Sequence, residues 1–179
     1  MLFTIDPSDA MERARAVTLL LLDVDGVLTA GELFLADSGE EIKAFSTLDG
    51  QGIKLLQRYG VRVGILSGRK SQLLSKRAAN LGIEIIIQGR EDKLDALNEL
   101  CKKEKLDPSQ IAYVGDDLPD IQVLKAVRLG FSVPNAHSTV KEVAHVQTES
   151  AGGLGAVREV CDFILQAQGL YDDAIAPYL

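Results

Sequence analysis

Short apolar runs alternate with segments of helical periodicity along most of the chain. Continuous apolar strands separated by helices are typical of a parallel sheet that is covered on both faces. The pattern therefore predicts an α/β fold with a Rossmann-like, three-layer architecture. The apolar runs predict strands near 18–22, 61–66, 83–87, 111–114, 129–133 and 145–148. The segments between them predict helices near 52–59, 71–81, 92–105, 119–127 and 155–168.

One segment after the first strand departs from this alternation. Residues 32–36 and 41–46 have strand character and are joined by the turn-forming residues 37–40, so they predict a β-hairpin. Its first strand is apolar on both faces at Leu33, Phe34 and Leu35. Because a solvated hairpin does not need apolar side chains on both faces, we expect part of this flap to be covered.

Length, charge and cysteine use limit the class of protein. The 179 residues suffice for one domain, which we expect to span 1–179 with a flap at about 32–46 and a tail at about 169–179. The net charge of −7 argues against nucleic acid or an anionic membrane as partner. The apolar stretch 16–22 is too short to span a bilayer. Cys101 and Cys161 fall on apolar helix faces, as expected of core residues in the reducing cytoplasm.

Polar side chains stand at the ends of several predicted strands. Asp23 and Asp25 follow the first strand, Ser67 ends the second and Asp116 follows the fourth. Lys93 begins the helix after the third strand. Because the carboxyl ends of parallel strands meet at one edge of the sheet, we expect these side chains to converge there.

The carboxylates indicate the chemistry. Two of them 4 Å apart repel by about 4 kcal/mol in an effective dielectric of 20, so Asp23, Asp25 and Asp116 beside a phosphate require a hard divalent cation such as Mg²⁺. With the cation bound, Asp23 can attack phosphorus and form an acyl phosphate. Asp25 can protonate the leaving oxygen and then activate the hydrolytic water. Ser67 and Lys93 would hold the other phosphoryl oxygens.

Each of these features is common when it occurs alone. An isolated Asp-x-Asp is more often a turn with a solvated carboxylate, and a lone lysine is more often a surface residue. Their arrival in order at consecutive strand ends is specific, and in this the chain resembles the haloacid dehalogenase superfamily of phosphatases. It matches the four motifs of that superfamily at 23–29, Ser67, Lys93 and 115–117 with Asp120.

Other segments narrow the resemblance to the phosphatases of 3-deoxy-D-manno-octulosonate 8-phosphate (KDO 8-phosphate). These are the hairpin in place of a cap domain, Asp49-Gly50-x-Gly52-Ile53, Ser67-Gly68-Arg69-x-Ser71 and the glycine-rich stretch 152–159. The resemblance covers about 15–169 and implies hydrolysis of KDO 8-phosphate through an aspartyl phosphate, in lipopolysaccharide precursor biosynthesis. It also implies that Mg²⁺ is held by the carboxylates of Asp23 and Asp116 and the backbone carbonyl of Asp25.

The same resemblance implies a set of substrate-binding residues. A sugar acid phosphate carries a carboxylate and a phosphate, and arginine and lysine suit both groups. Many relatives have Val-Arg where this chain has Thr47-Leu48, so one side-chain contact to the substrate is lost. Lys54 and Arg77 are explained almost equally well as solvated residues of a helix face. The implied set is Asp25, Asp49, Gly50, Lys54, Ser67, Gly68, Arg69, Arg77 and Lys93.

Three alternatives remain open. A phosphatase of a nine-carbon sugar acid 9-phosphate would resemble this chain, although such relatives tend to have Gly-Glu-Lys where Gly68-Arg69-Lys70 stands. A phospho-switch of the response-regulator type also uses aspartate, Mg²⁺ and lysine, but it places an adjacent acidic pair on the first strand. A structural subunit without activity is the third, and the intact motifs argue against it.

The exposed hairpin predicts an assembly. The resemblance implies a homotetramer in which hairpins of several subunits pack together and a neighbour covers each site, since this chain has no cap domain to exclude water. Whether 152–158 and the C-terminal tail reach a neighbouring site is not decided by the sequence.

Overall fold

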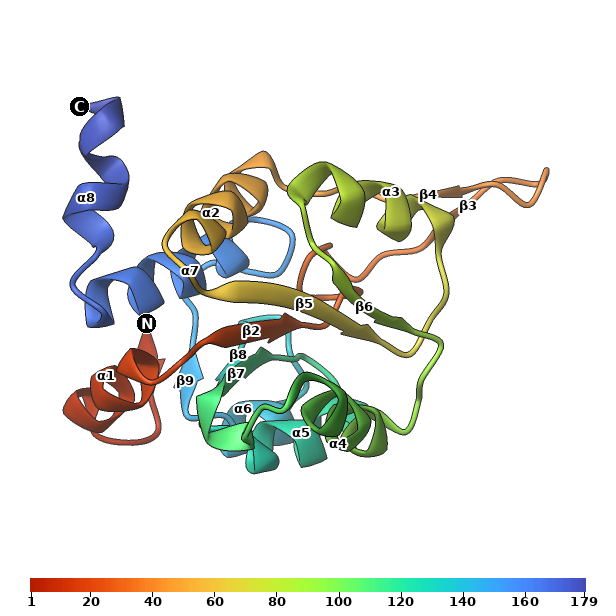
Figure 1. The fold of residues 1–179 in the computed structure, drawn as a ribbon. Coiled ribbons are helices and arrows are strands. Elements are labelled where there is room, and N and C mark those ends of the chain that lie inside the picture. The colour runs from red at the N-terminus through yellow and green to blue at the C-terminus, as the bar shows by residue number, and fades with distance from the viewer.

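The computed structural model describes residues 1–179 and forms three layers around a seven-stranded sheet (Figure 1). The order in this sheet is β1-β9-β8-β7-β2-β5-β6, and all neighbours are parallel except β1 and β9. The strands are β1 (Leu2–Phe3), β2 (Leu19–Leu22), β5 (Arg62–Ser67), β6 (Ile85–Gln88), β7 (Ile111–Val114), β8 (Leu129–Ser132) and β9 (Val146–Gln147).

Helices cover both faces of the sheet, as a parallel sheet requires. Figure 1 shows α2, α3 and α7 on one face and α4, α5 and α6 on the other. No helix is both long enough and apolar enough to cross a membrane. The helices are α1 (Pro7–Arg15), α2 (Thr47–Arg58), α3 (Gln72–Leu81), α4 (Lys93–Glu104), α5 (Ile121–Ala126), α6 (Ser138–Val143), α7 (Ala156–Ala167) and α8 (Tyr171–Ile175). Short 3₁₀ turns form at Pro108–Gln110, Leu118–Asp120 and Ala176–Tyr178.

Strand β2 lies inside the sheet, between β7 and β5, and its leucines are all buried. The chain passes from β2 to β5 on one side and later returns to β7 on the other side. In open α/β sheets such a reversal leaves a crevice beyond the carboxyl ends of the strands, and ligands bind there. The topology therefore places the residues that follow β2 and β7 next to each other.

The hairpin is present but shorter than predicted. Strands β3 (Phe34–Leu35) and β4 (Glu41–Ile42) pair antiparallel, with Phe34 opposite Ile42. The hairpin extends away from the body of the molecule, at the right of Figure 1. The rest of 32–46 has no strand pairing, because no neighbouring strand accepts its backbone hydrogen bonds.

The predicted helix 52–59 begins earlier, at Thr47. Its N-cap is Ser46, whose hydroxyl accepts the N–H of Asp49 at 3.3 Å. Gly50 and Gly52 obscured the first turn of this helix in the sequence pattern, and both lie in close contact with side chains of other elements. A Cβ at Gly52 would lie 2.8 Å from the Arg158 side chain, and one at Gly50 would lie 2.4 Å from that of Arg77. Close packing therefore outweighs the low helix propensity of glycine here.

Four elements had no sequence prediction: β1, α1, α6 and α8. Helix α1 does carry a start signal, because the Asp6 carboxylate accepts the N–H of Ser8 at 2.8 Å and Pro7 follows. Only Ala10 and Ala14 of this helix are buried, so it lacks a strong apolar stripe. The predicted helix 119–127 begins with the 3₁₀ turn and continues as α5.

Candidate active site

A polar pocket of about 310 Å³ lies at the carboxyl ends of β2, β5 and β7. None of its lining residues is hydrophobic. It contains the four catalytic residues predicted from the sequence together with the predicted metal ligands. The lining consists of Asp23, Asp25, Gly31, Ser67, Gly68, Arg69, Glu91, Lys93, Asp116, Asp117, Pro119 and Asp120.

The buried pair of Asp23 and Lys93 forms the centre of this pocket. The Lys93 ammonium lies 2.9 Å from Asp23 Oδ1 and 2.5 Å from Asp120 Oδ1. Burial lowers the pKa of Lys93, but the two carboxylates outweigh this effect, so its pKa lies above the ordinary value and the ammonium stays charged. Lys93 is therefore a permanent cation beside the predicted nucleophile.

Asp120 holds this lysine and the loop after β7 in place. It is fully buried, and Tyr113 from β7 donates its hydroxyl to Asp120 Oδ1 at 2.5 Å. Its other oxygen accepts the N–H groups of Asp116 and Asp117 at 3.0 and 3.1 Å. Since all its acceptor positions are used, Asp120 orients Lys93 and Asp116 and has little capacity left for a ligand.

Asp23 and Asp116 are neighbouring carboxyl groups in similar surroundings. Burial raises the pKa of Asp23, and the nearby Asp120 raises it further. Burial and the charges of Asp23 and Asp120 raise the pKa of Asp116 in the same way. Asp116 Oδ1 is buried without a hydrogen-bond partner, and a buried acceptor of this kind costs free energy unless something else satisfies it.

This donor set fits a hard divalent cation. Carboxylate oxygens of Asp23, Asp116 and Asp120 lie within 4.8 Å of one another, and the unpartnered oxygen of Asp116 is available. The loop backbone fits closely around this group, because a Cβ at Gly26 would lie 2.0 Å from Asp116 Oδ2. Oxygen donors of this type suit Mg²⁺.

Asp25 and Arg69 lie at the mouth of the pocket. Arg69 Nε is 3.6 Å from Asp25 Oδ2, and the Arg69 side chain is about half exposed, at 51%. Ser67 is buried, and its hydroxyl accepts the N–H of Arg69 at 3.3 Å. The predicted acid–base carboxylate and the predicted carboxylate-binding arginine are therefore neighbours before any substrate binds.

Four predicted substrate residues, Asp49, Gly50, Lys54 and Arg77, lie outside this pocket. The Asp49 carboxylate is buried and accepts the N–H of Arg158 at 2.8 Å, at the start of α7. Arg77 donates to the carbonyl of Ser46 at 2.9 Å, with its guanidinium over the Phe45 ring. Lys54 is exposed on α2. In this chain, Asp49 and Arg77 have structural contacts that the sequence did not predict.

Gly50 and the glycine-rich segment serve as close-packing positions. Gly50 lies against Arg77, and Gly152 against the loop after β2, where a Cβ would meet the Gly26 carbonyl oxygen at 1.7 Å. Asn135 links the same two loops by donating to Gly26 O at 2.9 Å and accepting from Gly152 N at 2.8 Å. The glycine-rich segment therefore supports the nucleophile loop of its own subunit.

Two charged hairpin residues that the sequence analysis did not single out contact the residues at the mouth of the pocket, Asp25 and Arg69. The Lys43 ammonium contacts the Asp25 carboxylate, and Glu41 accepts from Arg69 at 3.3 Å. Glu41 and Lys43 alternate with Ile42, so the two-residue period of a strand places them on one face. That alternation was the sequence signal for a charged face of the hairpin, but it does not show whether this face turns toward the site.

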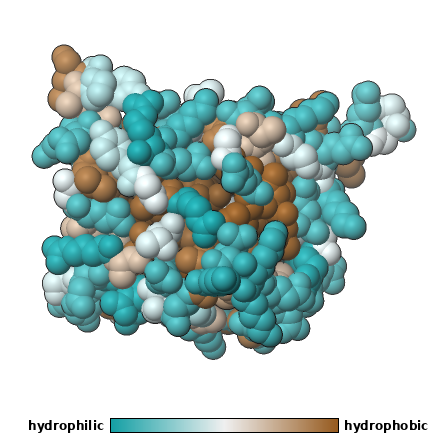
Figure 2. All heavy atoms as spheres, viewed as in Figure 1, coloured by the Kyte–Doolittle hydropathy of each residue, from teal (hydrophilic) through white to brown (hydrophobic).

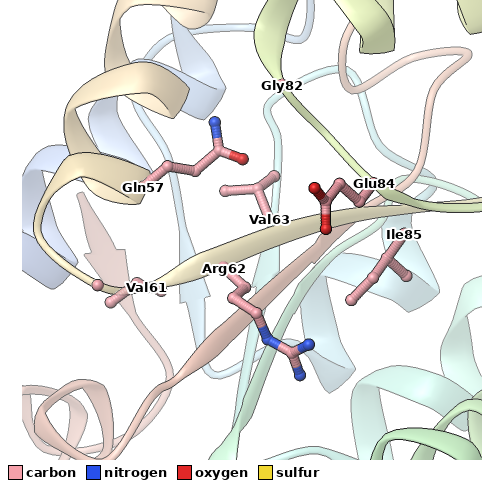
Figure 3. A pocket seen from close by; sticks show the side chains of 8 residues that line it. Gln57, Val61, Arg62, Val63, Gly82, Glu84 and Ile85 are labelled. Carbon is pink, nitrogen blue, oxygen red and sulfur yellow. The ribbon is translucent and has the colours of Figure 1, made fainter.

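A second pocket, of about 230 Å³, lies at the opposite, amino ends of β5 and β6 (Figure 3). In Figure 3 Arg62 points away from Gln57. Both side chains are already paired, Arg62 with Glu104 at 2.9 Å and Gln57 with the Leu81 carbonyl at 2.8 Å. No cluster of carboxylates or nucleophiles lines this pocket, so the chemistry resides at the carboxyl edge.

The arrangement at that edge can transfer a phosphoryl group. It offers a nucleophilic carboxylate, a neighbouring carboxylate at the mouth, a buried ammonium, a hydroxyl and oxygen donors for a cation. Acyl-phosphate chemistry requires these elements together.

Comparisons with known proteins agree with this arrangement. The family model of haloacid dehalogenase-like hydrolases matches residues 83–160. The chain is 45% identical to the KDO 8-phosphate phosphatase KdsC of Escherichia coli over 167 residues, 93% of this chain and 89% of that protein.

Solved structures resemble the model over nearly its whole length. A probable YrbI family phosphatase from Pseudomonas syringae is 51% identical, with a TM-score of 0.94 and coverage of 96% of this chain and 97% of that one. The KDO 8-phosphate phosphatase of Moraxella catarrhalis, solved with magnesium, phosphate and KDO, is 41% identical, with a TM-score of 0.95 and coverage of 97% and 99%. The chain therefore belongs to the KdsC family of KDO 8-phosphate phosphatases, among the haloacid dehalogenase-like hydrolases.

Proposed function

We propose that this protein hydrolyses KDO 8-phosphate to KDO and inorganic phosphate, with Mg²⁺ as its cofactor, in the supply of lipopolysaccharide precursors. The observation that carries the proposal is the buried ion pair of Asp23 and Lys93 beside Asp116 at the sheet edge. The same residue types in the same order characterise the superfamily, and the Moraxella relative holds magnesium, phosphate and KDO.

In the proposed reaction, the Asp23 carboxylate attacks phosphorus and the oxygen of the sugar leaves. Asp25 donates a proton to that leaving oxygen, and in the second half it takes a proton from the water that hydrolyses the aspartyl phosphate. Lys93 lies 2.9 Å from Asp23 and can donate hydrogen bonds to the phosphoryl oxygens. The Ser67 hydroxyl adds a neutral donor.

The cation would be held by the carboxylates of Asp23 and Asp116 and by the backbone carbonyl of Asp25. When bound, Mg²⁺ supplies positive charge that offsets the repulsion between these carboxylates and the phosphate. The unpartnered Asp116 oxygen supports this assignment. Asp120 would stay outside the ligand set, because Lys93, Tyr113 and backbone N–H groups already occupy it.

The sugar acid would bind at the mouth of the pocket. Arg69 is half exposed there and lies two residues beyond Ser67, the last residue of β5, so its guanidinium can pair with the carboxylate of the sugar. Gly68 gives the substrate access to the backbone of the same turn. Lys54 is exposed and would contact the substrate from the outer rim of the site. Arg77, Asp49 and Gly50 would either contact the substrate there or hold the rim in place through their packing.

We further propose a cytoplasmic, single-domain homotetramer. Both cysteines are free and buried, which suits a reducing compartment. Five apolar side chains on or near the hairpin are strongly exposed in the single chain, which supports burial against other subunits. They are Leu33 (43%), Phe34 (52%), Leu35 (67%), Ile42 (63%) and Leu48 (58%).

A substrate panel assayed with and without Mg²⁺ tests the catalytic proposal. We expect KDO 8-phosphate to give the highest kcat/KM, and neutral hexose phosphates to lag far behind because they leave Arg69 unpaired. Chelation should abolish turnover, Mg²⁺ should restore it, and Ca²⁺ should inhibit because it prefers more ligands at longer distances. Equal efficiency with glucose 6-phosphate would refute the substrate class, and a preference for a nine-carbon sugar acid 9-phosphate would reassign it.

A further inference from the structure

The hairpin contributes charged side chains to the active site. Glu41 lies in the second strand of the hairpin, and Lys43 is the residue just after that strand; both lie on the same face. Ile42 between them is exposed on the other face. Glu41 accepts hydrogen bonds from the Ser71 hydroxyl at 3.0 Å and from Arg69 at 3.3 Å. These contacts attach the hairpin to the turn between β5 and α3.

Lys43 lies deeper in the site than any other hairpin residue. Only 2% of its side chain is exposed, and its ammonium contacts Asp25 Oδ1 and lies 3.5 Å from Glu41. Burying an ammonium is costly unless a carboxylate compensates it. A lysine that served only to anchor the hairpin could keep its charge in water, so its burial against Asp25 requires another reason.

The Asp25 carboxylate is held from both sides. Lys43 contacts Oδ1, and Arg69 Nε lies 3.6 Å from Oδ2. A carboxylate with a cation on each oxygen cannot rotate freely about its terminal torsion, and a general acid–base must stay within hydrogen-bond reach of the atom that it serves. Arg69 is half exposed and available to substrate, whereas Lys43 is enclosed.

We propose that Lys43 is a positioning residue for Asp25: the hairpin inserts this lysine so that the acid–base carboxylate keeps its orientation when Arg69 turns to the substrate. The proposal rests on the role of Asp25 in the proposed function. In this proposal the hairpin also has a function within its own subunit. The hydrogen bonds of Glu41 with Ser71 and Arg69 hold the hairpin against the site and so set the position of Lys43.

A double-mutant cycle tests this role. Lys43→Met is made in the wild type and in Asp25→Asn, and kcat and KM are measured with Mg²⁺ and p-nitrophenyl phosphate. In the wild type we expect kcat to fall about 10- to 100-fold while KM changes by less than about threefold. In Asp25→Asn the same substitution should change kcat by less than about twofold, because the carboxylate that it positions is gone.

Two further variants complete the experiment. Lys43→Arg keeps the charge and should recover most of the lost kcat. Lys76→Met, which removes an exposed lysine on α3 without a salt bridge, should leave kcat unchanged. Melting temperature and solution mass are recorded for each variant, and if Lys43→Met does not fold, Lys43→Gln replaces it in both backgrounds.

Two outcomes overturn the proposal. Equal losses of kcat in both backgrounds would show that Lys43 acts independently of Asp25. A raised KM at constant kcat would make it a substrate-binding lysine instead. Because the cycle uses a generic ester, a wild type that cleaves p-nitrophenyl phosphate but not KDO 8-phosphate would refute the proposed substrate without affecting this result.

Discussion

Some residues at the sheet edge have a proposed catalytic role, and others hold those residues in position. Asp23 and Asp25 stand two positions apart, yet Asp23 is buried beside Lys93 while Asp25 faces Arg69 at the mouth. Asp120 binds only protein groups. The two carboxylates of one Asp-x-Asp thus have different surroundings, as their proposed roles of nucleophile and acid–base require.

Asn substitutions separate the proposed roles of these two residues. Asp23→Asn should eliminate turnover with the fold intact, because an amide cannot attack phosphorus. Asp25→Asn should lower kcat about 10²- to 10⁴-fold through lost proton transfer. Steady-state kinetics and circular dichroism measure both, and near-normal activity of a folded Asp23→Asn protein would contradict the mechanism.

The raised pKa values of Asp23 and Asp116 predict that, in the absence of metal, these ionised carboxylates lower the free energy of unfolding. A carboxyl whose pKa is raised by folding favours the folded state while protonated, and this advantage disappears as pH rises through the raised pKa. Without Mg²⁺, Asp116→Asn should therefore be more stable than wild type by roughly 0.5–2 kcal/mol near neutral pH. The difference should grow with pH.

Magnesium should reverse this order. It binds the folded wild type and stabilises it by mass action, whereas the Asn variant offers a weaker ligand and should gain little. Urea unfolding at two pH values, with chelator or with Mg²⁺, measures all four conditions. Equal stabilisation of both proteins by Mg²⁺ would place the cation elsewhere.

At the scale of elements, a side chain from one helix caps another. The N-cap of α7 is Gly155, which has no side chain to accept the first N–H groups. The Asp49 carboxylate from α2 accepts the N–H of Arg158 instead, and burial raises its pKa while that hydrogen bond opposes the rise. Asp49 thereby joins α2 and α7, which pack together over the sheet.

Asp49→Ala should act on stability more than on catalysis. Loss of a buried charged acceptor should cost roughly 1–3 kcal/mol of unfolding free energy, with kcat on p-nitrophenyl phosphate changed by less than about threefold. Glu12→Ala, which removes an exposed carboxylate of α1, serves as the control. A large rise in KM for KDO 8-phosphate with unchanged stability would instead support the substrate role that the resemblance implies.

At the scale of the whole molecule, the surface leaves two apolar regions uncovered. Figure 2 shows one between α3 and α4, over the edge strand β6, whose isoleucines are only partly buried. The other comprises the hairpin residues Leu33, Phe34 and Leu35. Lys43 and Glu41 of the hairpin contact Asp25 and Arg69 at the mouth of the pocket.

The hairpin patch predicts assembly. Phe34→Asp with Leu35→Lys should convert a tetramer into smaller species in light scattering, because charges replace side chains that are 52% and 67% exposed in the single chain. If a neighbour also closes the site, activity should fall on dissociation. A wild-type monomer with full activity would refute the assembly, and a dissociated variant with full activity would refute the shared closure.

The sequence by itself determined the α/β class, the positions of the central strands along the chain and the residues at their ends. These depend on local periodicity and on the rule that parallel strands end at one edge, so Asp23, Ser67, Lys93 and Asp116 could be placed before the structure. The Asp49 and Arg77 contacts could not, because capping and backbone contacts across elements depend on how helices pack.

Only the tertiary structure decided which side chains enter the site from outside those strand ends. Lys43 is distant from Asp25 along the chain, and the sequence does not specify whether a hairpin turns toward the site or away from it. The short β1 and helices α1, α6 and α8 were missed for a related reason. Their local patterns are weak: β1 and α1 contact the distant β9 and α7, whereas α6 and α8 are short and pack against their neighbours along the chain, α5 and α7. Periodicity reports burial along one element, whereas long-range contacts decide which charges meet.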